Sequence, residues 1–75
     1  MYFFKSNMDK VKLEFTLNGR KKTYLRRLDM YGKPLTTTNI NSARGVKENE
    51  VPQYLKILYL EYGKNNIQDI NIIKG

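Results

Sequence analysis

The residues with the clearest chemical potential are the cations of the stretch NGRKKTYLRRL, which covers positions 18–28. Five lysine and arginine side chains surround one tyrosine there. Cationic groups bind phosphate or carboxylate oxygens, and an aromatic ring among them can stack on a nucleobase. Two hypotheses follow: the stretch binds a polyanion, or it is the solvated side of a small sheet.

Side chains suited to catalysis or metal binding are scarce. The chain has no histidine and no cysteine, which excludes the common nucleophile–base pairs and thiolate or imidazole metal sites. The two acidic residues that lie closest to each other in sequence, Glu48 and Glu50, precede an expected helix, where negative charge is favoured by the helix dipole. The sequence predicts a non-enzymatic protein without metal or cofactor, with a lone lysine or tyrosine acting as acid or base as the remaining catalytic alternative.

The charge balance predicts the class of partner. Fourteen lysine and arginine residues against seven acids give a net charge of +7, which attracts acidic surfaces of any kind. Lysine is also enriched by AT-rich coding sequences, whereas arginine is not. Arg26 and Arg27 therefore count for more than the lysines around them.

The length allows one domain, which we expect over residues 1–75 with residues 1–9 as a loosely ordered lead. The apolar start MYFF is interrupted by Lys5, so it is too short for a secretory signal or a membrane span. We expect a cytoplasmic protein that does not contact membranes.

Two strands and a turn position the cationic stretch. Residues 10–17 alternate strictly between apolar and polar side chains, as a half-buried strand does. A three-residue loop over positions 17–19 sets Val11 opposite Leu25 and Tyr24 opposite Lys12, which keeps one face apolar. The other face is then cationic and carries a predicted binding site of Lys10, Lys12, Arg20, Lys22, Tyr24 and Arg26. A bulge is expected near Arg26 and Arg27 because Leu28 falls out of phase.

The remaining elements are a short helix near residues 38–45 with Thr38 as its N-cap, a main helix and a last strand. The main helix has Asn49 as the expected N-cap, Pro52 in its first turn and Gly63 after its last turn. Isoleucines near the C-terminus indicate the strand. We therefore predict an α+β two-layer domain of order ββ(α)αβ, in which a β-hairpin and the C-terminal strand form a three-stranded antiparallel sheet packed on the main helix.

The main helix has more apolar side chains than one stripe can hold. Val51, Tyr54, Leu55, Leu58, Tyr59 and Tyr62 share one broad stripe. Ile57 and Leu60 fall on its flank. We take Ile57, Tyr59 and Leu60 as a candidate protein contact, because tyrosine is enriched at interfaces; ordinary packing in the core is the alternative.

The segment KKTYLRRLDMYGKPLTTTNINSARGVKENEVPQYLKILYLEYGKNNI, residues 21–67, resembles small phage and prophage proteins of low-GC Gram-positive bacteria. The shared features are a lysine-rich hairpin, a threonine-rich turn, an Ala-Arg step and the helix sequence YLKILYLEYG. The resemblance implies a host-takeover factor, an inhibitor of a defence system or a small DNA-associated regulator, acting in the host cell. It carries no site residues across.

These observations favour a small accessory protein that engages an acidic macromolecular surface, in the first place a host protein or nucleoprotein complex, as an inhibitor or regulator. The alternative is direct nucleic-acid binding through Lys12, Lys22, Tyr24 and Arg26. A homodimer formed through the apolar flank of the helix is a third hypothesis.

Overall fold

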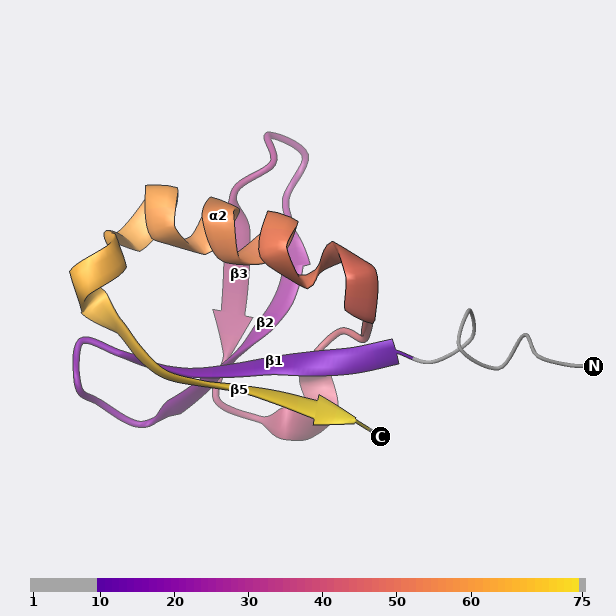
Figure 1. Cartoon of the computed structure of the whole chain (residues 1–75), viewed down its shortest axis with the longest axis horizontal. Coiled ribbons are helices and arrows are strands. Elements are labelled where there is room, and N and C mark those ends of the chain that lie inside the picture. Colours follow the sequence, from indigo (N-terminus) through magenta and orange to yellow (C-terminus); the bar gives the residue numbers. More distant parts are fainter. Residues whose placement is uncertain (1–9, 75) are drawn as a thin grey trace, which may run out of the picture.

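The computed structural model describes residues 10–74; Gly75 and the predicted lead over residues 1–9 lie outside the described part. The elements are β1 (Lys10–Leu17), β2 (Lys22–Leu28), β3 (Pro34–Thr37), η1 (Ile40–Ser42), β4 (Val46–Lys47), η2 (Glu48–Glu50), α2 (Val51–Tyr62), η3 (Lys64–Asn66) and β5 (Ile67–Lys74). The five strands form an antiparallel sheet, and α2 lies across one face of it (Figure 1). The predicted α+β class is confirmed.

Strand β1 is the centre of the sheet. Glu14 pairs with Tyr24 of β2 and with Asn71 of β5, so these two strands lie on opposite edges of β1. The same reasoning places β4 opposite β5, because Val11 pairs with strands on both sides. Strands β2 and β4 therefore share one edge of β1 end to end, and β3 pairs with the outer edge of β2.

The expected number of three strands is wrong, because β3 and β4 are additional. Strand β3 closes a hairpin with β2 in which Leu28 pairs with Pro34, and Pro34 is the first residue of its strand, a position where its missing N–H is tolerated. The predicted helix near residues 38–45 is a single 3-10 turn, η1. Its N-cap is Asn39, whose side chain accepts a 2.9 Å hydrogen bond from the amide of Asn41, and not Thr38.

The turn between β1 and β2 differs from the expected loop. Asn18 and Gly19 both have positive φ, 56° and 70°, and the amide of Arg20 donates to the carbonyl of Leu17 at 3.1 Å, which is a two-residue hairpin turn. One extra residue, Lys21, then shifts the register. The predicted pairing of Tyr24 with Lys12 is wrong, because Tyr24 lies opposite Glu14.

The core lies between α2 and the sheet. The predicted helix stripe is confirmed: Val51 and Leu58 are buried, and its other members pack against the core. Pro52 sits in the first turn, and the amide of Gly63 donates to the carbonyl of Tyr59 at 2.8 Å. The predicted N-cap Asn49 is wrong, because η2 leads into the helix and Glu50 is the N-cap. The buried residues of this core cluster are Val11, Leu13, Phe15, Leu25, Val46, Val51, Leu58 and Ile67.

Two irregularities bend the sheet. The pairing of β2 with β3 shifts between Leu25 and Arg27, which confirms the bulge expected there. The pairing of β1 with β5 shifts between Glu14 and Thr16, and on β5 this coincides with Asp69, whose φ is 53°. Bulges of this kind increase the twist of a strand.

Candidate functional site

The predicted cationic face is assembled only in part. Lys10, Arg20, Lys22 and Arg26 are exposed, as the prediction requires. Lys12 is half-buried, and its ammonium group donates a 2.9 Å hydrogen bond to the carbonyl of Ile40 in η1. The segment that contains η1 lies on the side of the sheet away from α2 (Figure 1) and therefore covers part of the face that we expected to be open.

Tyr24 does not offer an aromatic platform on this face. Its exposed fraction is 8%, and its hydroxyl donates a 2.9 Å hydrogen bond to Oε2 of Glu14. Asn71 donates to Oε1 of the same carboxylate at 3.1 Å. The prediction of an exposed ring at position 24 is wrong, because the shifted register places this ring beside a carboxylate that it satisfies.

The two hydrogen bonds also change how the pair titrates. The pKa of Glu14 is lowered below its usual value of 4.5, mainly by the hydrogen bond from Asn71 and next by the hydrogen bond from Tyr24. The hydrogen bond to Glu14 raises the pKa of Tyr24 above its usual value of 10.0. Across neutral pH the pair therefore consists of a carboxylate and a protonated phenol.

Cations that are far apart in sequence meet where β2 and β4 share the edge of β1. Lys10 and Lys47 are direct partners in the ladder. The amide of Arg44 donates to the carbonyl of Leu25 at 3.1 Å, which holds the backbone of Arg44 against the residue that precedes Arg26. The backbone of Gly45 lies against the side chain of Lys10, since a Cβ on Gly45 would be 3.1 Å from the Cβ of Lys10. We call Lys10, Arg26, Arg44 and Lys47 the junction cluster.

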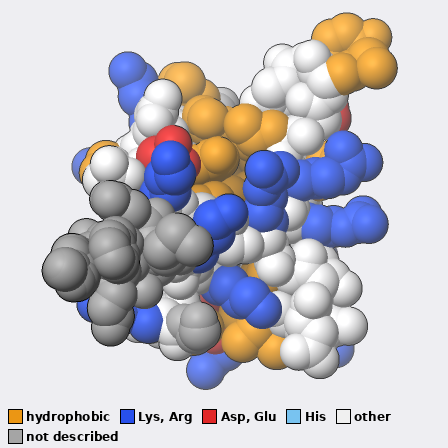
Figure 2. All heavy atoms as spheres, turned by 90° about the vertical axis from the view of Figure 1, so that its right-hand side faces the viewer, with side chains coloured by type: hydrophobic (Ala, Val, Ile, Leu, Met, Phe, Trp, Pro, Cys, Tyr) orange, Lys and Arg blue, Asp and Glu red, His pale blue; other side chains and the backbone are white. Residues whose placement is uncertain are grey.

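The junction cluster is exposed at the end of the molecule where β1 begins. All four side chains are exposed, and Figure 2 shows lysine and arginine side chains gathered next to hydrophobic ones on this end. Arg44 and Lys47 were not predicted as site residues. The pattern of β1 could not reveal them, because they come from a loop and from a strand of two residues.

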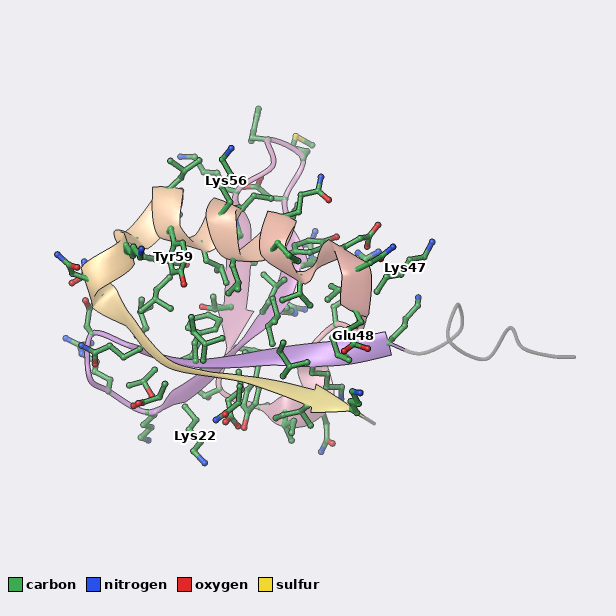
Figure 3. All side chains as sticks on the ribbon, viewed as in Figure 1. Lys22, Lys47, Glu48, Lys56 and Tyr59 are labelled. Atoms are coloured by element: carbon green, nitrogen blue, oxygen red, sulfur yellow. The ribbon has the colours of Figure 1, made fainter. Side chains whose placement is uncertain are left out.

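The other cations are spread over both layers. Among residues 10–74, the ion pair within 4.0 Å is that of Lys74 with Glu48, at 3.8 Å. Lys22 points away from the sheet on the side opposite α2, whereas Lys56 points outward from the helix (Figure 3). Positive charge is thus available on several sides, and the junction cluster is where the pairing of the strands concentrates it.

A wide depression of about 580 Å³ lies beside the turn between β1 and β2. Its lining residues include Arg20 and Lys21 together with Leu17 and Thr23. Arg20, a predicted site residue, is therefore placed at the turn and not in the junction cluster.

The three residues of the predicted protein contact on α2 lie in two different environments. Leu60 has an exposed fraction of 78%, whereas Ile57 and Tyr59 are half-buried. Tyr59 packs against the core, and the ammonium group of Lys64 lies 6.0 Å from its ring centroid. Ile57 and Leu60 instead line a groove of about 210 Å³, whose other lining residues are Gly32, Lys33, Pro34 and Glu61.

The turn between β2 and β3 carries two further apolar side chains that the sequence did not single out. Met30 and Tyr31 have exposed fractions of 86% and 81%. We call residues 29–33 the tip. A sequence signal was present, since Met and Tyr are unusual between Asp29 and Gly32 in a turn.

No group of three or more acidic, histidine or cysteine residues among positions 10–74 could hold a metal ion. In the same range, no helix is long and apolar enough to cross a membrane. No protein-family model, curated protein or solved structure matches the chain.

Proposed function

We propose that this is a small non-enzymatic accessory protein of the phage type, which engages an acidic macromolecular surface, in the first place a host protein or nucleoprotein complex, as an inhibitor or regulator. The junction cluster is the observation that carries the proposal. It unites cations from β1, β2, β4 and the preceding loop on one exposed end.

The cluster is electrostatically unfavourable without a partner. Like charges directly opposite in an antiparallel ladder repel, and Lys10 and Lys47 hold these positions. Within residues 10–74, Glu48, which follows Lys47 in sequence, is paired with Lys74 and not with the cluster. An acidic partner would relieve this repulsion and would also be attracted from a distance by the net charge of +7.

Nucleic acid is the second candidate, because phosphates can be neutralised by the same lysines and arginines. The burial of Tyr24 counts against it. Base stacking on aromatic side chains provides much of the affinity for single strands, and the ring placed on this face by sequence reasoning is covered.

The test compares two charge reversals of equal size. One variant carries Arg44→Glu with Lys47→Glu, in the junction cluster. The control carries Lys56→Glu with Lys64→Glu, both exposed near or on α2. Each tagged protein is incubated with nuclease-treated lysate of a low-GC Gram-positive host, and retained proteins are quantified by mass spectrometry.

The proposal expects specific proteins to be retained by the original chain and the control, and lost with the junction variant. Equal loss with both variants would indicate attraction by net charge alone and would overturn the site. A parallel titration of labelled oligonucleotides at low and near-physiological salt tests the second candidate. Submicromolar binding at the higher salt, lost with the junction variant, would replace the protein partner by nucleic acid, because charge-driven binding alone weakens to roughly 10⁻⁴–10⁻⁶ M there.

A further inference from the structure

The tip is held in one conformation by its own hydrogen bonds. Oδ1 of Asp29 accepts from the amides of Tyr31 and Lys33 at 2.8 and 2.9 Å. The amide of Asp29 donates to the carbonyl of Lys33 at 2.8 Å, and the amide of Gly32 donates to the carbonyl of Asp29 at 3.0 Å. Gly32 has a φ of 81°, which a residue with a side chain rarely adopts.

This fixed turn presents Met30 and Tyr31 almost entirely to solvent. A turn that served only to connect β2 and β3 would be satisfied by small polar residues. A rigid tip loses little conformational entropy when it binds, and tyrosine offers a large contact area with few rotatable bonds. Tyrosine and methionine are also among the residues enriched at protein interfaces.

The surroundings of the tip are cationic on the strand side. Lys33 belongs to the tip, and Arg26 and Arg27 are exposed on the strand that leads to it. On the helix side, Lys33 and Glu61 both line the groove under the tip, so charge there is mixed. Oδ1 of Asp29 accepts from two amides of the tip, and the negative charge of this carboxylate offsets the positive charge of Lys33. The excess positive charge thus comes from β2, which also connects the tip to the junction cluster through Arg26.

We propose that the tip is the anchor of a protein interface: Tyr31, assisted by Met30, contacts an apolar site on a partner protein, and carboxylates around that site face Arg26, Arg27 and Lys33. This inference rests on the proposed function and specifies its partner. A nucleic-acid backbone or polyphosphate would satisfy the cations but gives Met30 no apolar surface. A protein surface that combines acidic and apolar side chains satisfies both.

The experiment uses two labelled polymers of equal length, polyglutamate and a random copolymer of glutamate and tyrosine, and measures their binding to the full chain by fluorescence anisotropy at near-physiological salt. The copolymer carries fewer charges but adds apolar rings. We expect it to bind roughly tenfold more tightly than polyglutamate, and Tyr31→Ser to remove that difference. Leu60→Ser tests the competing contact on α2, because Leu60 is similarly exposed and lines the groove beside the tip, and the inference expects this substitution to leave the difference unchanged.

Each outcome decides between the two proposals. If both polymers bind equally and Tyr31→Ser has no effect, the anchor is excluded while the acidic-surface function stands. If neither polymer binds, both fail. If Leu60→Ser removes the difference as fully as Tyr31→Ser does, the apolar contact is on the helix and the inference is wrong. Melting curves of both variants establish folding, and Met30→Ser provides a second substitution at the tip.

Discussion

The hydroxyl of Tyr24 donates a 2.9 Å hydrogen bond to Oε2 of Glu14, directly across the ladder between β2 and β1. Asn71 reaches the other oxygen of the same carboxylate from β5. Three strands are thereby joined by one buried acid on the face away from the helix. Because the arrangement satisfies both carboxylate oxygens, Glu14 can remain charged in a buried position without an ion pair.

This pair predicts that stability falls at both ends of the pH range. The pKa of Glu14 is lowered, so the stability that Glu14 contributes is complete above pH 4.5 and is lost as the pH falls through the folded pKa. The pKa of Tyr24 is raised, so its contribution is complete below pH 10.0 and is lost as the pH rises through the folded pKa. Thermal melting followed by circular dichroism across pH 2–12 measures both limbs.

The control for this prediction is Tyr24→Phe, which keeps the ring and removes the donor. We expect a melting temperature lower by several degrees at neutral pH and a weaker decline above pH 10.0. An unchanged alkaline limb would show that another group causes it.

Lys47→Glu should stabilise the fold and weaken binding. The substitution replaces a like-charged pair with an attractive one opposite Lys10, and cross-strand pairs are worth roughly 0.2–1 kcal/mol. Urea denaturation at low salt should show a gain of this size, which added salt reduces. Lys64→Glu makes the same reversal of charge at another exposed position and should not produce this gain in stability. If Lys47→Glu destabilises the fold instead, the two lysines do not repel.

Strict periodicity made β1 and α2 predictable. The alternation over residues 10–17 and the apolar stripe of the helix both reflect burial against one core, so local pattern and tertiary structure agree. Strand β3 lacks this signal. Its residues Pro34, Leu35, Thr36 and Thr37 do not alternate between apolar and polar, and they become a strand through pairing with β2.

The candidate site was less predictable because it depends on register. The two-residue turn and the extra residue Lys21 together move the partner of Tyr24 from Lys12 to Glu14, and the ring of this predicted binding residue is buried. The junction cluster depends on the pairing of β4 with β1, which consists of only two residue pairs. Exposure at the tip depends on the hairpin between β2 and β3, and β3 was not among the predicted strands.

Asp69 is predicted to tolerate glycine but not valine. Its φ of 53° lies in the left-handed region, which costs roughly 1–2 kcal/mol for most residues and more for β-branched ones, whereas aspartate and glycine adopt it readily. Asp69→Gly should therefore change the free energy of unfolding by less than about 1 kcal/mol, and Asp69→Val should lower it by about 2 kcal/mol. Gln68→Val, at the exposed neighbouring position, is the control, and an equal effect there would exclude backbone strain as the cause.

Alanine substitutions at Leu58 and Leu60 should differ sharply in their effect on the free energy of unfolding, although the two residues are only two positions apart. Leu58 is fully buried and Leu60 is 78% exposed. Leu58→Ala should cost roughly 2–5 kcal/mol, a large part of the roughly 4–11 kcal/mol expected for a domain of this size. Leu60→Ala should change the free energy of unfolding by no more than about 0.5 kcal/mol. Urea denaturation measures both, and a large loss at Leu60 would mean that this side chain is buried in solution, for example between two copies of the chain.

Asp29→Ala should loosen the tip while leaving the rest of the sheet intact. The substitution removes the acceptor of two amides, those of Tyr31 and Lys33, and we expect a loss of about 1 kcal/mol because water can replace the carboxylate at this half-exposed position. Amide hydrogen exchange measured by NMR should become faster at these two residues and stay unchanged at Leu13 and Phe15 in β1. Glu61→Ala removes the same charge on α2 and should leave exchange at the tip unchanged. If the amides of the tip exchange equally fast in the original chain and in Asp29→Ala, the carboxylate does not order the turn, and Tyr31 would have to lose its freedom at the moment of binding.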